Sequence, residues 1–158
     1  MPLDPEFIAD ALYEPEGLMI DAVLEIDLAQ SLVRLSMPTS AELPITRTQR
    51  VREGVHPRHV SGGLIVHMTG VCGFAHFYYV LGLRHADGWT GYGARINSAR
   101  FHNLALPGPP LILECRATQV RKLPPNIYVR YAFRFTQGDQ LIYEGDQTAL
   151  WSKVAQSG

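Results

Sequence analysis

The sequence contains only two cysteines and no excess of charge of either sign. Cys72 and Cys115 form no C-x-x-C pair and lack the spacing of a metal site, so we expect two buried thiols in a reducing, cytoplasmic setting. Lys and Arg number 14 and Asp and Glu 15, which gives a net charge of −1. This balance argues against a protein that binds a polyanion, and we expect no nucleic-acid partner.

Internal repeats and low-complexity tracts are also missing, and we expect no cleaved signal peptide. The first residues, Met-Pro-Leu-Asp-Pro-Glu-Phe, have no basic region followed by an apolar stretch, which favours a cytoplasmic location. Only the run 64–83 has the length of a bilayer span, and two histidines and three glycines interrupt it, so we expect no membrane insertion. With 158 residues, 46% of them hydrophobic, the chain predicts one domain over residues 1–158.

Acidic residues are absent between Glu53 and Asp87, and this stretch holds the most apolar part of the chain. It predicts a buried helix that begins after Ser61 as N-cap and runs to about Gly82. The two glycines that follow Ser61 would bring bare backbone N–H groups close to a ligand. An apolar helix of this kind has to be covered by other secondary-structure elements.

Alternating apolar and polar residues predict that a β-sheet covers this helix. A first strand is expected within 18–28, with a core face of Leu18, Ile20, Ala22, Leu24, Ile26 and Leu28. A second, shorter strand carries Val33, Leu35 and Met37, and four more are expected near 90–105, 111–122, 126–137 and 140–152. One long helix among antiparallel strands predicts an α+β fold, in which a curved sheet wraps the central helix.

Three motifs give the chain a resemblance to a known superfamily. Ala99-Arg-Phe-His-Asn-Leu-Ala-Leu-Pro-Gly-Pro-Pro-Leu111 resembles the A-R-F-x-x-x-x-x-P-G-x-x-L strand of the β-hydroxyacyl-acyl-carrier-protein dehydratases of the hotdog superfamily. Gln137-Gly-Asp-Gln-Leu-Ile-Tyr-Glu144 resembles that family's later turn and strand, and His59-Val-Ser-Gly62 resembles its H-F-P-G, whose histidine is catalytic. The resemblance covers residues 59–150 and implies a hotdog fold.

Two departures from hotdog enzymes concern their carboxylates. The dehydratases' helical carboxylate corresponds to Gly73, and the aspartate of the D-x-x-G-H-V-N thioesterase branch corresponds to Val55. Dehydration normally needs two positioned acid and base groups, so losing one weighs against it. The FcoT-like long-chain acyl-CoA thioesterases are more similar, because there a histidine and a small polar residue precede a helix that does not depend on an acid.

The resemblance implies an enzyme that hydrolyses acyl-CoA or acyl-carrier-protein thioesters. Dehydration, hydration or conjugate addition at β-hydroxyacyl or 2-enoyl thioesters is the alternative, and a non-catalytic module that binds acyl thioesters is a third reading. No separate cofactor and no metal are expected, since coenzyme A or phosphopantetheine is part of the substrate. An acyl carrier protein is a candidate partner, and hotdog domains pair, so a homodimer or higher oligomer is expected.

Candidate site residues follow from this interpretation. His59 is the candidate general base, with a cap or turn brace as its alternative role. His76 and Thr69 border Gly73 at helical spacing, so either could replace the missing carboxylate by positioning a water, with packed helix residues that make local hydrogen bonds as the alternative. Helix-start N–H groups would stabilise an oxyanion. The residues expected to bind substrate are Ser61, Gly62, Gly63, Arg58, Arg100 and Phe101.

The connection from residue 38 to 58 is long and holds four arginines. Arg47, Arg50, Arg52 and Arg58 could contact the phosphates of coenzyme A or the acidic surface of an acyl carrier protein. A solvated basic loop is the alternative.

Overall fold

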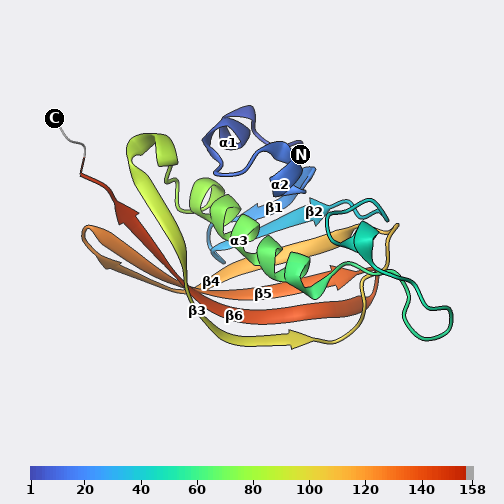
Figure 1. Ribbon diagram of the computed structural model, residues 1–158. Coiled ribbons are helices and arrows are strands. Elements are labelled where there is room, and N and C mark those ends of the chain that lie inside the picture. The colour runs from blue at the N-terminus through green and yellow to red at the C-terminus, as the bar shows by residue number, and fades with distance from the viewer. Residues whose placement is uncertain (156–158) are drawn as a thin grey trace.

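A six-stranded antiparallel sheet curves around one long helix in the computed structural model, which describes residues 1–155 (Figure 1). The strand order is β1-β2-β4-β5-β6-β3. The strands are β1 Ala22–Asp27, β2 Leu32–Met37, β3 Trp89–Phe101, β4 Leu111–Leu123, β5 Asn126–Gln137 and β6 Gln140–Lys153. The helices are α1 Pro5–Asp10, α2 Pro15–Leu18, α3 Gly62–Tyr79 and the short 3₁₀ turns η1 Thr46–Thr48 and η2 His85–Asp87.

The inner face of the sheet and α3 form the core, as the apolar pattern predicts. On β5 the alternation is complete, because Tyr131 and Phe133 are buried while Arg130 and Arg134 are exposed. Cys72 and Cys115 are both buried free thiols, and burial raises the pKa of each.

The central helix ends three residues earlier than the predicted end near Gly82. Leu83 N–H donates to the Phe77 carbonyl at 3.0 Å, and Gly82 adopts a φ of +67°. This left-handed glycine lets the chain turn back over the last carbonyls of the helix. Hydrophobic periodicity alone extends through such a turn because its residues remain apolar.

The predicted core face of the first strand is wrong at Leu24 and at Leu28, which lies after the end of β1 and is 68% exposed. Val23 is buried, whereas Leu24 is 47% exposed. The register with β2 shifts between Val23 and Glu25, which makes Leu24 the extra residue of a β-bulge. Period-two reasoning fails here because a bulge moves every following side chain to the opposite phase. The second strand follows its prediction, with Val33, Leu35 and Met37 fully buried.

The N-terminal segment packs against the C-terminal end of α3, on the side away from the sheet (Figure 1). The Tyr78 hydroxyl donates to the Asp4 carboxylate at 2.8 Å, and the Asp10 carboxylate accepts the backbone N–H groups of His85 and Ala86 at 2.8 Å each. Desolvation, and after it the hydrogen bond to Asp4, raises the pKa of Tyr78 to about 12. The segment therefore closes one end of the core.

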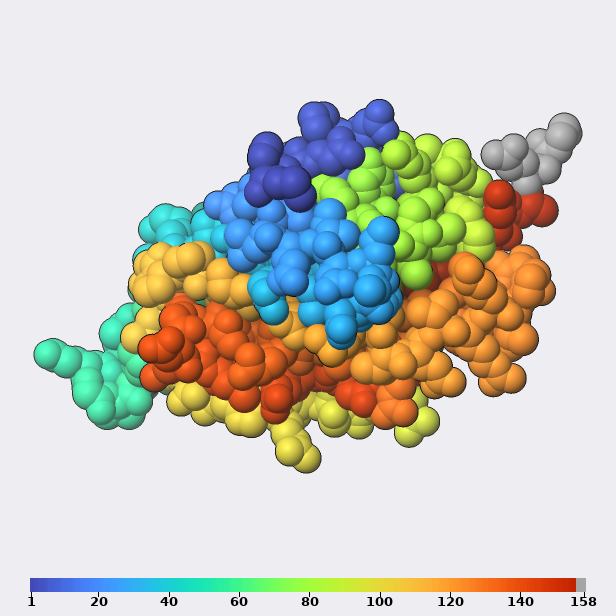
Figure 2. All heavy atoms as spheres, turned by 180° about the vertical axis from the view of Figure 1, so that it is seen from behind, coloured from blue at the N-terminus to red at the C-terminus, as the bar shows by residue number. Residues whose placement is uncertain are grey.

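β3 is an edge strand of 13 residues with one side unpaired. Its side chains Tyr92, Ile96 and Phe101 are 64%, 52% and 54% exposed. The connection before α3 also projects from the body, around residues 50–57 (Figures 1 and 2). Within residues 1–155, no helix is long and apolar enough to cross a membrane.

Gly91 is required by its close contact with the β6 tryptophan. A Cβ atom built on Gly91 would lie 2.1 Å from the Trp151 ring and 2.6 Å from the Leu150 carbonyl oxygen. We therefore expect Gly91→Ala to lower the free energy of unfolding by about 3 kcal/mol. Urea denaturation measures it, with Gly93→Ala on the same strand as control, because a Cβ there meets nothing within 4 Å. Equal stability of the two variants would contradict the prediction.

Candidate functional site

Two hollows lie beside α3, one between its start and the end of β3, the other between the helix and strands β3, β5 and β6. The first, the helix-start hollow, has a volume of about 280 Å³ and is lined by His59, Val60, Gly62, Ile65, Phe101, His102, Asn103, Leu104 and Ala105. The second, the glycine slot, measures about 60 Å³ and is lined by Thr69, Gly70, Gly73, Phe74, Tyr92, Gly93, Tyr131, Phe133, Gln147, Ala149 and Trp151. Both hollows use successive turns of the same helix. Larger surface concavities lie elsewhere and contain none of the predicted site residues.

His59 lines the helix-start hollow, and hydrogen bonds fix both its backbone and its imidazole ring. The Gln49 amide accepts from the His59 N–H at 3.0 Å and donates to the His59 carbonyl at 2.9 Å. The ring Nδ1 lies 2.9 Å from the Pro57 carbonyl, which can only accept, so Nδ1 carries the proton. Nε2 is then the basic nitrogen, as a general base requires.

The start of α3 supplies N–H groups beside His59. Ile65 N–H donates to the Ser61 carbonyl at 3.0 Å, so the N–H groups of Gly62 and Gly63 precede the helical ladder. Ser61 is the N-cap, as predicted, but its side chain makes no capping hydrogen bond. The Phe101 ring covers Gly62, where an added Cβ would lie 3.3 Å from Cε1. The structure thus brings His59, Gly62 and Phe101 together in one hollow, and Gly63 follows next in the helix.

Thr69 faces the glycine slot, where it meets a residue of β6. The Gln147 side-chain N–H donates to the Thr69 hydroxyl at 2.9 Å, and this hydroxyl donates to the Val66 carbonyl at 2.7 Å. Gly73 lines the same slot, one turn further along the helix. A neutral hydroxyl and amide therefore stand beside the position that holds a carboxylate in the dehydratases.

His76 is fully buried and lines neither hollow. Its Nε2 donates to the Ser31 carbonyl at 3.0 Å, and its Nδ1 accepts from the Tyr131 hydroxyl at 3.2 Å. That hydroxyl in turn accepts from Trp151 Nε1 at 3.3 Å. Desolvation lowers the His76 pKa to about 4, so the ring stays neutral. Both ring nitrogens are occupied, which leaves none for positioning a water.

Arg58 and Arg100, which were both predicted to bind substrate, lie outside the two hollows. Arg58 donates to the Thr46 carbonyl at 2.7 Å and so braces the long connection. Arg100 lies opposite Glu144 in the sheet, and its neighbour Phe101 points to the inner face, so Arg100 points to the outer face.

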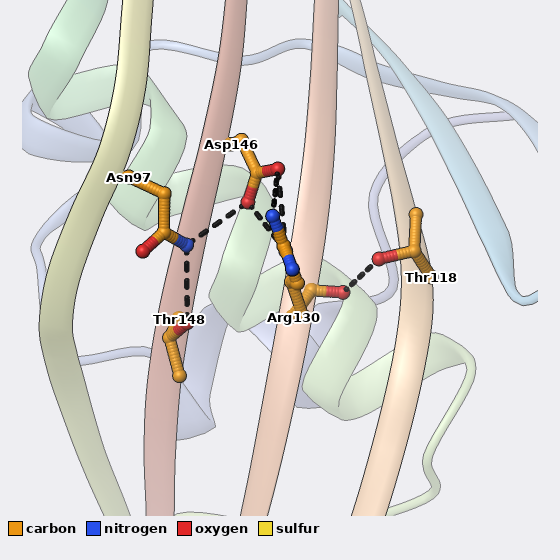
Figure 3. Close-up of polar contacts among 5 residues, drawn as sticks. All are labelled: Asn97, Thr118, Arg130, Asp146 and Thr148. Carbon is orange, nitrogen blue, oxygen red and sulfur yellow. Dashed lines mark hydrogen bonds and ion pairs between the residues drawn. The ribbon is translucent and has the colours of Figure 1, made fainter.

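An outer-face network holds the strands that form the slot (Figure 3). The Arg130 guanidinium donates to both carboxylate oxygens of Asp146, at 2.9 Å from Nε and 2.7 Å from Nη2. Asn97, which lies in the bulge of β3, donates to Asp146 at 3.0 Å and to Thr148 at 3.2 Å. The Arg130 contact lowers the Asp146 pKa. Because Asp146 and Thr148 flank Gln147, this network sets the position of the Gln147 side chain on the inner face.

Sequence reasoning missed three polar residues of this region. Gln49 lies in a loop ten positions before His59, and Gln147 lies four strands away from α3 in the chain order, so no local spacing connects them. His102 lines the helix-start hollow and bonds Glu144 at 3.1 Å. Its position directly after Ala99-Arg-Phe could have identified His102 as a site residue from the sequence. Within the described part of the chain, no group of three His, Cys, Asp or Glu side chains could hold a metal ion.

Comparison with known proteins connects this architecture to solved structures. A mutant (Q49A) of thioesterase PA1618 from Pseudomonas aeruginosa matches with a TM-score of 0.64 and 15% identity, over 98% of this chain and 96% of that one. The dehydratase heterocomplex ApeI:P from Xenorhabdus doucetiae gives 0.65 at 10% identity, over 99% and 93%. The PaaI protein of the E. coli phenylacetic acid degradation operon gives 0.62 at 14%, over 91% and 88%.

The chain has a hotdog fold. The fold predicted from the motifs is therefore confirmed, together with its central helix and curved antiparallel sheet. No protein-family model matches the sequence, and no curated protein matches it. At these sequence identities, the structural similarity establishes the fold alone. The chemistry has to be argued from the residues of the two hollows.

Proposed function

We propose that this hotdog protein hydrolyses acyl thioesters of coenzyme A or of an acyl carrier protein. The observation that carries the proposal is the position of His59, which lines the same hollow as Gly62 at the start of α3 and whose Nδ1 is held by the Pro57 carbonyl, so that Nε2 is the basic nitrogen. Thioesterases and a dehydratase among the similar structures support chemistry on acyl thioesters for this fold.

The reaction proceeds through an oxyanion at the start of α3. His59 Nε2 removes a proton from water, the water oxygen bonds to the thioester carbon, and the carbonyl oxygen takes up negative charge against the Gly62 and Gly63 N–H groups. When the C–S bond breaks, the imidazolium returns the proton to the leaving thiolate. The products are a carboxylic acid and a free thiol.

Thr69 and Gln147 take the place of the missing carboxylate in this proposal. Their hydrogen bond, 2.9 Å long, orients two uncharged polar groups toward the slot, where they can bind a thioester or a water. Neither can exchange a proton near neutral pH. Hydrolysis with one titrating base is thus favoured over dehydration, which needs a second acid or base. His76 has a structural role instead.

A homodimer that pairs the β3 edges would complete this site. The unpaired edge, with the exposed Tyr92, Ile96 and Phe101, runs beside both hollows, so a second copy would cover them. For the 17.6 kDa chain, light scattering is expected to give twice that mass. The Ile96→Lys variant should shift the mass toward the monomer and lose activity. A fully active monomer would contradict this arrangement.

The function is tested by two signals in the same sample. Purified protein is incubated with saturated and 2-enoyl-CoA substrates of several chain lengths, and the release of free thiol and the loss of the enoyl chromophore are followed together. Thiol release supports hydrolysis. Enoyl loss without thiol release would replace it with hydration or conjugate addition, and acyl-CoA binding without either signal would leave a binding module. An acyl carrier protein carrying the same acyl group distinguishes the two carriers.

Gln49 is expected to act by positioning His59. Replacing Gln49 with Ala removes two hydrogen bonds to the His59 backbone and should lower kcat by about tenfold, since a small displacement of a base costs that much. Gln49→Glu keeps one acceptor and should retain more activity. Steady-state thiol release is measured as a function of pH. The pH values at which the rate rises and falls should be the same as for wild type. A loss confined to protein stability would contradict positioning.

A further inference from the structure

The inner face of the sheet continues beyond the C-terminal end of α3 (Figure 1). The β4–β5 hairpin, the end of β6 and the connection around η2 border a hollow of about 1090 Å³ there. Most of its wall is apolar and consists of Leu83, Trp89, Pro124, Pro125, Ile127 and Val154. A hollow of this size is large enough for a small organic ligand.

Both lysines of the chain line this hollow, which we call the lysine hollow. The 14 basic residues of the sequence are 12 arginines and the two lysines Lys122 and Lys153. Lys122 lies opposite the buried Ile127 in the sheet, and Lys153 lies opposite Trp89, so both lysines belong to the inner face. The Lys153 ammonium lies 6.0 Å from the centroid of the Trp89 ring, which places this charge at the apolar wall.

The protein leaves these two positive charges without partners. Neither Lys122 nor Lys153 forms an ion pair with any of residues 1–155. Asp87 is the only acidic residue among the described residues of the lining, so two lysines and one aspartate give it a net charge of +1. No arginine belongs to this lining, and the planar fork of arginine is the group that matches phosphate best. A ligand with one negative charge and an apolar body is therefore complementary to the hollow.

We propose that the lysine hollow binds an amphipathic monocarboxylate, an aliphatic chain that ends in one carboxylate. The chain lies against Trp89 and Ile127, and the carboxylate interacts with the lysine ammonium groups. β5 separates the strands of Lys122 and Lys153, so their backbones are about 10 Å apart. Flexible four-carbon side chains can converge on one carboxylate over that distance.

The lysine hollow is a separate site from the helix-start hollow. Trp89 begins β3 and Phe101 ends it, so roughly 35–40 Å of strand separates the two hollows. No residue lines both of them. Binding of a carboxylate in the lysine hollow goes beyond the proposed hydrolysis and does not require it.

The experiment titrates the full chain with decanoate and with 1-decanol and follows tryptophan fluorescence. Trp89 lines the hollow, whereas Trp151, the other tryptophan, is 2% exposed and lies outside it. Decanoate should change the fluorescence of wild type saturably, and Trp89→Phe should abolish this change. Lys122→Gln and Lys153→Gln should each raise the Kd for decanoate by about three- to tenfold and leave the Kd for 1-decanol unchanged.

Arg121 provides the matched control. It precedes Lys122 on β4, lies opposite Tyr128 and lines a concavity on the outer face of the sheet. Arg121→Gln removes the same charge from the neighbouring position, and it should leave the Kd for decanoate unchanged. Ala86 is exposed and lines the lysine hollow, so Ala86→Trp should fill the hollow and weaken the binding of both ligands.

Four results would overturn the proposal. The first is the absence of saturable decanoate binding to wild type. The second is an unchanged Kd in both lysine variants, which would leave the lysines only the role of keeping the hairpin soluble. The third is a fluorescence change that survives Trp89→Phe, which would place the ligand elsewhere. The fourth is displacement of decanoate by free coenzyme A, which would indicate a site for nucleotide phosphates. His59→Ala should bind decanoate with the Kd of wild type, whatever its effect on hydrolysis.

Discussion

Replacing His59 with alanine is expected to lower kcat for thioester hydrolysis by about 10²–10⁴-fold. The ring has one protonated nitrogen held by the Pro57 carbonyl, so the other is the only basic nitrogen that this residue offers to the helix-start hollow. Loss of the base leaves the N–H groups of Gly62 and Gly63 in place, and KM should change less than kcat. Thiol release under substrate saturation measures the effect.

A neighbouring histidine provides the control for this experiment. His56 has its ring centroid 5.1 Å from that of His59, yet it is exposed and lies outside the hollow. His56→Ala should keep nearly full activity, and added imidazole should partly restore His59→Ala. Should the two variants lose activity equally, the effect would belong to the loop as a whole and His59 would not be the base.

Acidification from pH 7.5 to 5 is expected to remove about 2 kcal/mol of unfolding free energy through His76 alone. Burial lowers the pKa of this ring from 6.5 to about 4, so the unfolded chain binds a proton in this range that the folded chain does not. The stabilisation is complete above pH 6.5 and disappears as the pH falls toward 4. A charged His76 would also have to reverse its hydrogen bond with the Tyr131 hydroxyl, because both ring nitrogens would then be donors.

Urea denaturation at several pH values tests this dependence. His76→Gln lacks the titrating ring, so its stability should fall by about 2 kcal/mol less than that of wild type over the same interval, although it starts lower at pH 7.5. His56→Gln removes an exposed histidine and serves as the control, with the slope of wild type. If His76→Gln kept the full slope, carboxylates elsewhere in the chain would account for it.

The elements with strong local patterns are those that sequence reasoning predicted well. β5 alternates without interruption from Ile127 to Phe135, and every side chain on its inner face is buried. The run after Ser61 forms the helix because nothing polar interrupts it for long, and its apolar surface had to be covered. The strand motif at residues 99–111, with the two weaker motifs beside it, implied the hotdog fold by resemblance, and the structure confirms that fold.

The first strand marks the limit of such patterns. Leu24 continues an apolar alternation, yet it is exposed because a bulge inserts it against β2. A bulge depends on the partner strand, and the partner's register is a nonlocal property.

The candidate site shows the same division between local and nonlocal information. The sequence by itself determined the buried helix and the placement of His59 and two glycines at its start, because these depend on periodicity and adjacent residues, and the resemblance of its motifs implied the hotdog fold. Only the tertiary structure decided that Gln49 holds His59, that Gln147 meets Thr69, and that Tyr131 and Ser31 occupy both nitrogens of His76. These contacts join residues up to 78 positions apart, and their geometry is set by how the sheet curves over the helix.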